Sequence, residues 1–136
     1  SGLSLGMDVP YLYRSLVFGA VCGLYRLIEG FEKQEIDIEK VIAVGGISKK
    51  SPYVMQMLSD LSGREIYILD SDQTCAQGAA MYAAVGAGIY ETLEVAAEHM
   101  AAKCIKIYKP DSEKKDWYKK HYQEYLKLAE AVNKLS

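Results

Sequence analysis

The sequence has little that would indicate a disulfide-linked, metal-bound or membrane-spanning protein. Its 136 residues include three cysteines, Cys22, Cys75 and Cys104, without the CxxC or histidine spacing typical of zinc ligands. Each lies among apolar or small residues, so we expect reduced packing residues in a cytoplasmic protein. No run approaches the roughly 18 consecutive apolar residues that a membrane span needs, and no secretory signal is visible.

A dominant charge of one sign is missing as well. The 16 basic and 18 acidic residues give a formal net charge of -2 and are mixed along the chain, apart from a lysine-rich patch near its end. We therefore expect neither nucleic acid nor a membrane surface as a partner. A start methionine is also lacking, because the chain opens on Ser1 and its first methionine is Met7. We expect it to be a piece of a longer protein.

Helices and strands alternate along the sequence. The expected order is a helix over 8–33, a strand over 41–44, a helix over 51–62, a strand over 65–69, helices over 76–90 and 92–102, an extended segment over 104–108 and an amphipathic helix from 111 or 112. The first strand, helix and strand predict a right-handed βαβ unit with parallel strands. Two or three parallel-type strands cannot make a complete sheet for so many helices, so we expect further strands upstream. Glycines in the first helix and small residues in the helix over 76–90 predict close packing inside a larger body.

The candidate ligand site is the turn after the first strand, in the stretch VIAVGGISKKSPYVMQMLSDL over 41–61. Ligands of open α/β sheets bind beyond the carboxyl ends of parallel strands, where Gly45 and Gly46 would let the backbone approach them. The pair lacks the GxGxxG and GxxxxGK[ST] spacings, so it can equally serve to turn a strand into a helix. Lys49 and Lys50 can be a solvated turn, and the Ser-Pro dipeptide that follows can simply cap a helix. The residues alone leave both interpretations open.

Other polar residues are expected to have structural roles. His99 and His121 are isolated on helices, with no carboxylate or cysteine at ligand spacing, so we expect surface or satisfied histidines. Carboxylates near strand ends are expected in caps and turns: Asp60, Asp70 and Asp72. Tyrosines of the last helix recur at helical spacing and are expected to dock it on the same domain, with a partner-binding face as the alternative: Tyr118, Tyr122 and Tyr125.

Four segments, in chain order, resemble the FGGY family of carbohydrate kinases. GLSLGMDVPYLYRSLVFGA resembles the second signature of the family, and VGGISKKSPYVMQMLSDLSGREI resembles its adenosine-site segment. CAQGAAMYAAVGAGIY resembles its Gly-Ala-Ala helix, and YKPDSEKKDWYKKHYQEYLKL resembles the tail of the L-ribulokinase branch. The resemblance covers essentially the whole chain.

The resemblance implies an α/β fold, part of an actin-like, RNase H-like ATPase domain without its first strands. Residues 1–109 would be the C-terminal portion of the second kinase domain, on the nucleotide side, and 110–136 a helix docked on it. The whole kinase would close two domains on ATP, Mg²⁺ and a sugar, and transfer the γ-phosphate to a terminal hydroxyl. The sugar implied is L-ribulose, with L-ribulose 5-phosphate as the product.

Carried over to this sequence, the backbone of Gly45, Gly46 and Ile47 would run along the adenine and ribose, and Lys50 and Ser51 would supply polar contacts. Ile47 stands where the family often has a third glycine. The catalytic aspartate and the sugar-binding residues of the family lie in the N-terminal domain, so the resemblance implies no catalytic residue and no metal ligand in this chain.

We therefore expect the 136 residues alone to be inactive. The alternatives are a xylulokinase or another FGGY kinase, and a non-catalytic binding module on the same scaffold. Whether the protein forms a homo-oligomer is left open.

Overall fold

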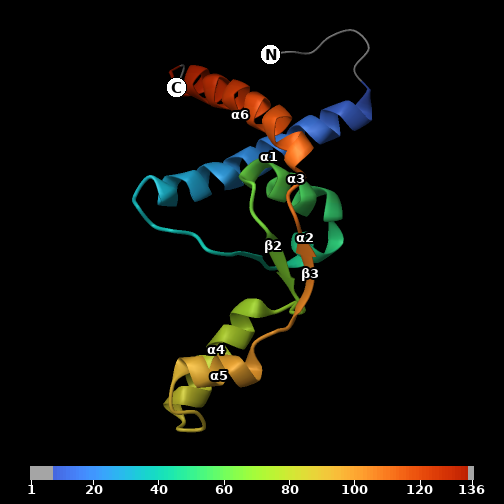
Figure 1. Cartoon of the computed structure of the whole chain (residues 1–136). Helices are drawn as coiled ribbons and strands as arrows, with labels where there is room; N and C mark the ends of the chain where they lie inside the picture. Colours follow the sequence, from blue (N-terminus) through green and yellow to red (C-terminus); the bar gives the residue numbers. More distant parts are fainter. Residues whose placement is uncertain (1–7, 135–136) are drawn as a thin grey trace.

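The computed structural model describes residues 8–134, so the signature residues 2–7 lie outside the described part. The elements in order are α1 (Val9–Glu32), β1 (Val41–Ala43), α2 (Gly46–Lys50), α3 (Pro52–Ser62), β2 (Ile66–Leu69), α4 (Thr74–Gly86), α5 (Leu93–Met100), β3 (Cys104–Tyr108) and α6 (Ser112–Asn133). The strands lie between two groups of helices, with α1, α3 and α6 at one end and α4 and α5 at the other (Figure 1). No helix of the described part is long and apolar enough to cross a membrane.

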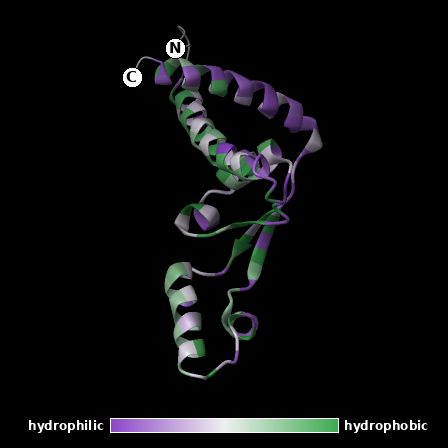
Figure 2. Ribbon diagram, turned by 90° about the vertical axis from the view of Figure 1, so that its left-hand side faces the viewer, coloured by the Kyte–Doolittle hydropathy of each residue, from purple (hydrophilic) through white to green (hydrophobic). Residues whose placement is uncertain are grey.

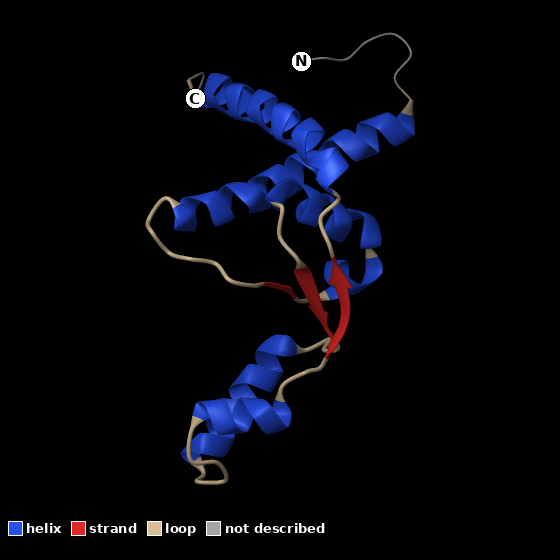
Figure 3. Ribbon diagram, in the orientation of Figure 1, coloured by secondary structure: helices blue, strands red, loops and turns tan. Residues whose placement is uncertain are grey.

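The sheet has three strands in the order β1-β2-β3 (Figure 3). β1 and β2 are parallel, with Val41 opposite Ile66, which confirms the predicted parallel pair. β3 is antiparallel to β2, with Ile66 opposite Tyr108, so the expectation of parallel-type strands is wrong for the third strand. The reason is that α4 and α5 reverse the chain before it returns to the sheet, and the Asp70 N–H donates to the Lys103 carbonyl at 2.9 Å where it does so.

Three helix ends lie where the sequence predicts them, whereas α4, expected over 76–90, runs over Thr74–Gly86. The Asp8 carboxylate accepts from the Tyr11 N–H at 2.9 Å at the start of α1, and Asp111 accepts from the Glu113 N–H at 3.1 Å at the start of α6. Gly63 ends α3 in the left-handed conformation, with φ of 67°. One helix was not expected, because Gly46–Lys50 forms the short helix α2 where the sequence predicted a turn.

The core lies between α1, α3, β2 and α6. Its largest fully buried side chains include Met57, Leu61, Ile66 and Tyr122. The Tyr122 hydroxyl donates to Glu29 Oε2 at 2.6 Å, and the Tyr122 ring meets that of Tyr25 edge-on, at 4.9 Å between centroids. The tyrosines of α6 thus pack the helix on the rest of the chain, as their spacing predicts. Figure 2 shows that α6 is otherwise largely hydrophilic.

Two of the three cysteines are not the packing residues expected from the sequence. All three are free, but Cys22 is buried whereas Cys75 and Cys104 are exposed. A Cβ added to Gly19 or Gly30 of α1 would meet nothing within 4 Å, so these glycines are not at close contacts. In α4 only Ala84 is buried. The outer faces of both helices have no neighbour in the described part of the chain, so close packing inside a larger body stays a prediction.

Candidate functional site

Two glycines, Gly45 and Gly46, follow the carboxyl end of β1, so no side chain covers the backbone there. Gly45 has φ of 89° and ψ of 179°, a conformation that is essentially restricted to glycine. The buried Ser48 hydroxyl donates to the Gly45 carbonyl at 2.7 Å and fixes the start of α2. A Cβ added to Gly45 or Gly46 would meet nothing within 4 Å. The two residues therefore offer bare backbone with free space beside it.

An ion-paired lysine connects this turn to the end of β2. Lys49 Nζ lies 3.1 Å from Asp70 Oδ1 and 2.9 Å from Asp72 Oδ1. The carboxyl ends of parallel strands meet at one edge of the sheet, which is why residues more than 20 positions apart come together here. The hydrogen bond from Lys49 lowers the pKa of Asp72, and the bonds to Asp72 and Asp70 raise the pKa of Lys49.

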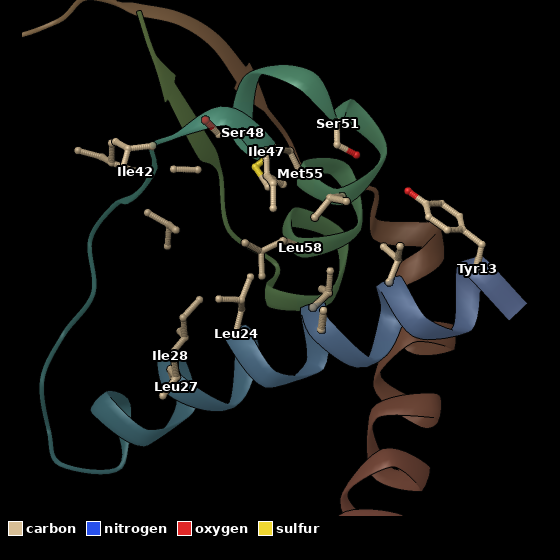
Figure 4. Close-up of a pocket in the computed structure, with 17 residues that line it drawn as sticks. Tyr13, Leu24, Leu27, Ile28, Ile42, Ile47, Ser48, Ser51, Met55 and Leu58 are labelled. Carbon is tan, nitrogen blue, oxygen red and sulfur yellow. The ribbon is translucent and has the colours of Figure 1, made fainter. Parts of the chain in front are cut away.

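An apolar groove of about 630 Å³ lies between α1, β1, α2 and α3 (Figure 4). It is lined by Tyr13, Val17, Ala20, Val21, Leu24, Leu27, Ile28, Val41, Ile42, Ala43, Val44, Ile47, Ser48, Ser51, Val54, Met55 and Leu58. The lining side chains include hydroxyls but no charged group. The groove therefore has no cationic side chain with which to neutralise a phosphate.

The five residues predicted for the site all lie within the stretch 45–51 but differ in surroundings. Gly45 and Gly46 form the open backbone, and Ile47 is 65 % exposed and borders the groove beside Met55 (Figure 4). Lys50 is exposed at the end of α2. Ser51 precedes α3 but makes no side-chain capping bond, so a purely capping role for its hydroxyl is not supported.

Sequence reasoning missed the role of Lys49, which it treated as part of a solvated turn. The signal was available in part, since Asp70 and Asp72 follow a strand that was predicted to run parallel to β1. Asp60, the third carboxylate near a strand end, is buried and accepts from Gln56 Nε2 at 2.7 Å, so it is structural. The side chains of these carboxylates therefore do not have the expected cap and turn roles, because Asp70 and Asp72 pair with Lys49 and Asp60 bonds Gln56.

The described residues contain no group of three or more histidine, cysteine, aspartate or glutamate side chains that could hold a metal ion. The acidic residues nearest the turn, Asp70 and Asp72, are both engaged by Lys49. These residues therefore do not fit a Mg²⁺ site of their own. His99 is exposed, and His121 is half-buried on the ring of Trp117, at 3.9 Å between centroids.

Solved sugar kinases share the fold of this chain. The xylulose kinase from Rhodospirillum rubrum matches 99 % of it with a TM-score of 0.85 and 21 % identity, over 27 % of the kinase chain. The glycerol kinase from Plasmodium falciparum matches 96 % of it with a TM-score of 0.75, over 26 % of that chain. The fold is thus that of the actin-like α/β domain found in sugar kinases, as the sequence predicts.

The family follows from sequence similarity. Residues 1–87 match the FGGY family of carbohydrate kinases, C-terminal domain, and the chain belongs to this family. The ribulokinase of Vibrio parahaemolyticus is 38 % identical over 98 % of the chain, and that of Shouchella clausii is 37 % identical over 93 %. The chain spans about a quarter of the length of these curated relatives, 24 % and 23 % respectively.

Proposed function

We propose that this chain is the nucleotide-binding part of a longer carbohydrate kinase that phosphorylates L-ribulose to L-ribulose 5-phosphate with ATP and Mg²⁺. The observation that carries the proposal is the similarity to ribulokinases over nearly the whole chain, 38 % identity over 134 residues. A kinase that draws on cellular ATP would act in the cytoplasm.

In this proposal the adenosine lies against the backbone of Gly45 and Gly46. The support is geometric, because both glycines have open space where a side chain would be, and a flat purine needs such close backbone approach. Lys50 and Ser51 would supply polar contacts at the edge of the same turn. Ile47 would add an apolar contact, since more than half of its side chain is exposed.

The phosphates and their Mg²⁺ would be handled by the rest of the kinase. Magnesium supplies charge neutralisation of the transferred phosphoryl group when it is bound. The carboxylates at the sheet edge are paired with Lys49, and the groove lacks charged side chains. The residues of this chain would therefore bind and orient the nucleotide rather than perform the proton transfer.

No described carboxylate near the turn is free to act as a base toward a sugar hydroxyl. Asp60 is buried with its oxygen already hydrogen-bonded, and Asp70 and Asp72 are ion-paired. A general base has to reach the proton that it removes. We therefore propose that the 136 residues alone do not phosphorylate a sugar. Sugar-dependent ADP release by the purified chain would contradict this part of the proposal.

The test of the function is ADP release by the full-length protein with ATP, Mg²⁺ and L-ribulose, D-ribulose, D-xylulose or glycerol. We expect turnover with L-ribulose, and at least a tenfold loss of kcat/KM for ATP in Gly46→Arg, whose side chain would fill the space beside the turn. Gly46→Ala is the matched control, because Gly46 has no left-handed φ and a single Cβ fits, so its loss should be smaller.

Other outcomes of this test are informative. Turnover confined to D-xylulose or glycerol would assign the protein to another FGGY kinase. If the folded protein releases no ADP with any of the sugars, the result would favour a non-catalytic binding module. Normal ATP kinetics in Gly46→Arg would place the nucleotide away from this turn.

A further inference from the structure

Lys49 is withdrawn from water more than the groups with which it pairs. Its side chain is 22 % exposed, whereas those of Asp70 and Asp72 are 64 % and 82 % exposed. The Lys49 ammonium group thus bridges two carboxylates on the loop that follows β2.

The turn that carries Lys49 consists of two glycines and a short helix. α2 has five residues, and the bond from the Ser48 hydroxyl to the Gly45 carbonyl is local to the turn. Gly45 and Gly46 have no side chains with which to pack. α2 otherwise packs on α3, the helix that directly follows it. The ion pairs of Lys49 join α2 to the end of β2, in addition to the pairing of β1 with β2 that precedes the turn.

We propose that Lys49 is a positioning residue for nucleotide binding, which holds the Gly45–Gly46 backbone in place by tying α2 to Asp70 and Asp72. The inference rests on the proposed function, because it assumes that the nucleotide lies on this turn. Lys49 does not touch the nucleotide in this role. Its loss lets the turn move and weakens the binding of ATP, while the binding of the sugar is unaffected.

The experiment measures steady-state kinetics of the full-length kinase with Lys49→Met, Lys49→Arg and the double variant D70N/D72N. We expect Lys49→Met to raise KM for ATP roughly three- to tenfold, the range set by loss of two exposed or half-buried ion pairs. The values of kcat and of KM for the sugar should stay within about twofold. Lys49→Arg keeps the charge and should restore most of the affinity. D70N/D72N should reproduce the effect of Lys49→Met.

The matched control is Lys109→Met. Lys109 also forms an ion pair, 3.4 Å from Glu65, but lies away from the turn, so its KM for ATP should be unchanged. Adding Lys49→Met to D70N/D72N should cause little further loss, since both changes break the same contact. If Lys49→Met does not fold, D70N/D72N tests the contact from the other side.

Two results separate failure of the inference from failure of the proposed function. Unchanged KM for ATP in Lys49→Met and in D70N/D72N, with a strong defect in Gly46→Arg, would overturn the role of Lys49 and leave the site intact. A lower unfolding temperature with unchanged KM would likewise reduce Lys49 to a stabilising ion pair. Unchanged KM for ATP in Gly46→Arg would overturn the site itself.

Discussion

The carboxylate of Asp60 accepts a hydrogen bond from the backbone N–H of Asp111 at 2.9 Å and so joins the last turn of α3 to the start of α6. Asp60 is 1 % exposed, and the same oxygen accepts from Gln56 Nε2 at 2.7 Å. A buried carboxylate is tolerated only where donors compensate for the lost water. These donors come from residues 4 and 51 positions away, which makes Asp60 the polar link between two helices distant in the sequence.

Replacing Asp60 with alanine should therefore destabilise the chain through α6. The change removes two hydrogen bonds and leaves the Asp111 N–H without its partner, which costs about 1–3 kcal/mol in the free energy of unfolding. Urea unfolding followed by circular dichroism measures the effect. The exposed Asp37→Ala is the control and should change little. Equal midpoints for the two variants would show that the link is not energetically important.

Stability should fall as the pH rises above about 10. Burial, and then the hydrogen bond to Glu29, raise the pKa of Tyr122, and burial also raises the pKa values of Tyr25 and Tyr118. A tyrosine whose folded pKa is raised stabilises the fold fully below its unfolded pKa, near 10, and loses that contribution as the pH climbs toward the folded value. Unfolding free energies measured from pH 7 to pH 11 test this expectation.

Tyr122→Phe provides the matched variant for the alkaline experiment. It keeps the ring but removes the hydroxyl that donates to Glu29, so it should cost about 0.5–1.5 kcal/mol at pH 7. The loss of stability between pH 10 and pH 11 should then be shallower than in the unsubstituted chain. A parallel pH profile for the two proteins would assign the alkaline loss to other groups.

Cys22 should be inert to thiol reagents in the folded state. Burial raises the pKa of its thiol to about 12, so almost no thiolate exists at pH 8. Cys75 and Cys104 are exposed and provide internal controls. We expect iodoacetamide to label these two while Cys22 reacts only after urea is added, as measured by peptide mass spectrometry. Labelling of Cys22 at the rate of Cys75 in native buffer would mean that α1 separates from the core.

Gly45 should not accept a side chain, although the space around it is open. Its φ of 89° with ψ of 179° is strained for any other residue, so Gly45→Ala should cost about 1–3 kcal/mol or shift the turn. Gly46→Ala, one position further, has no such strain and is the control. Urea unfolding of the chain and KM for ATP of the full-length kinase measure the two consequences. Equal behaviour of the two alanine variants would mean that the turn adopts another conformation.

The isolated 136-residue chain should self-associate. Leu16 and Leu27 are 76 % and 63 % exposed on α1, and Ile42 is 53 % exposed on β1, which is an edge strand of the described sheet. An open apolar face next to a strand edge favours pairing with another copy. Light scattering over a range of concentrations tests this. The variant L16K/L27K should associate less, and a monomer at high concentration would contradict the expectation.

Local signals in the sequence predict most helix ends and the parallel pair of strands. Asp8 caps the start of α1 and Gly63 ends α3 through contacts with residues a few positions away, so the sequence alone predicts these two helix ends. The apolar run over 41–44 is equally local, and the strand that it predicts is β1.

The missed features depend on distant parts of the chain. The direction of β3 is set by the reversal through α4 and α5, and no pattern within Cys104–Tyr108 records it. α2 is too short to show a helical period. Lys49 finds its partners 21 and 23 positions away, so the residue looks like a solvated lysine until the strands are placed. The adenosine site itself was inferred from family resemblance, and binding there stays a prediction.

The hydrogen bond between the Asp70 N–H and the Lys103 carbonyl brings together the two ends of the segment that carries α4 and α5. β2 and β3 are thus paired as in a hairpin. The segment between them, which carries α4 and α5, leaves the sheet and returns to it at one point (Figure 1). Closure entropy grows only with the logarithm of length, by about 0.6 kcal/mol for each doubling. Within the described chain, this segment can therefore gain or lose residues over evolution without changing the register of the strands that carry the Gly45–Gly46 turn.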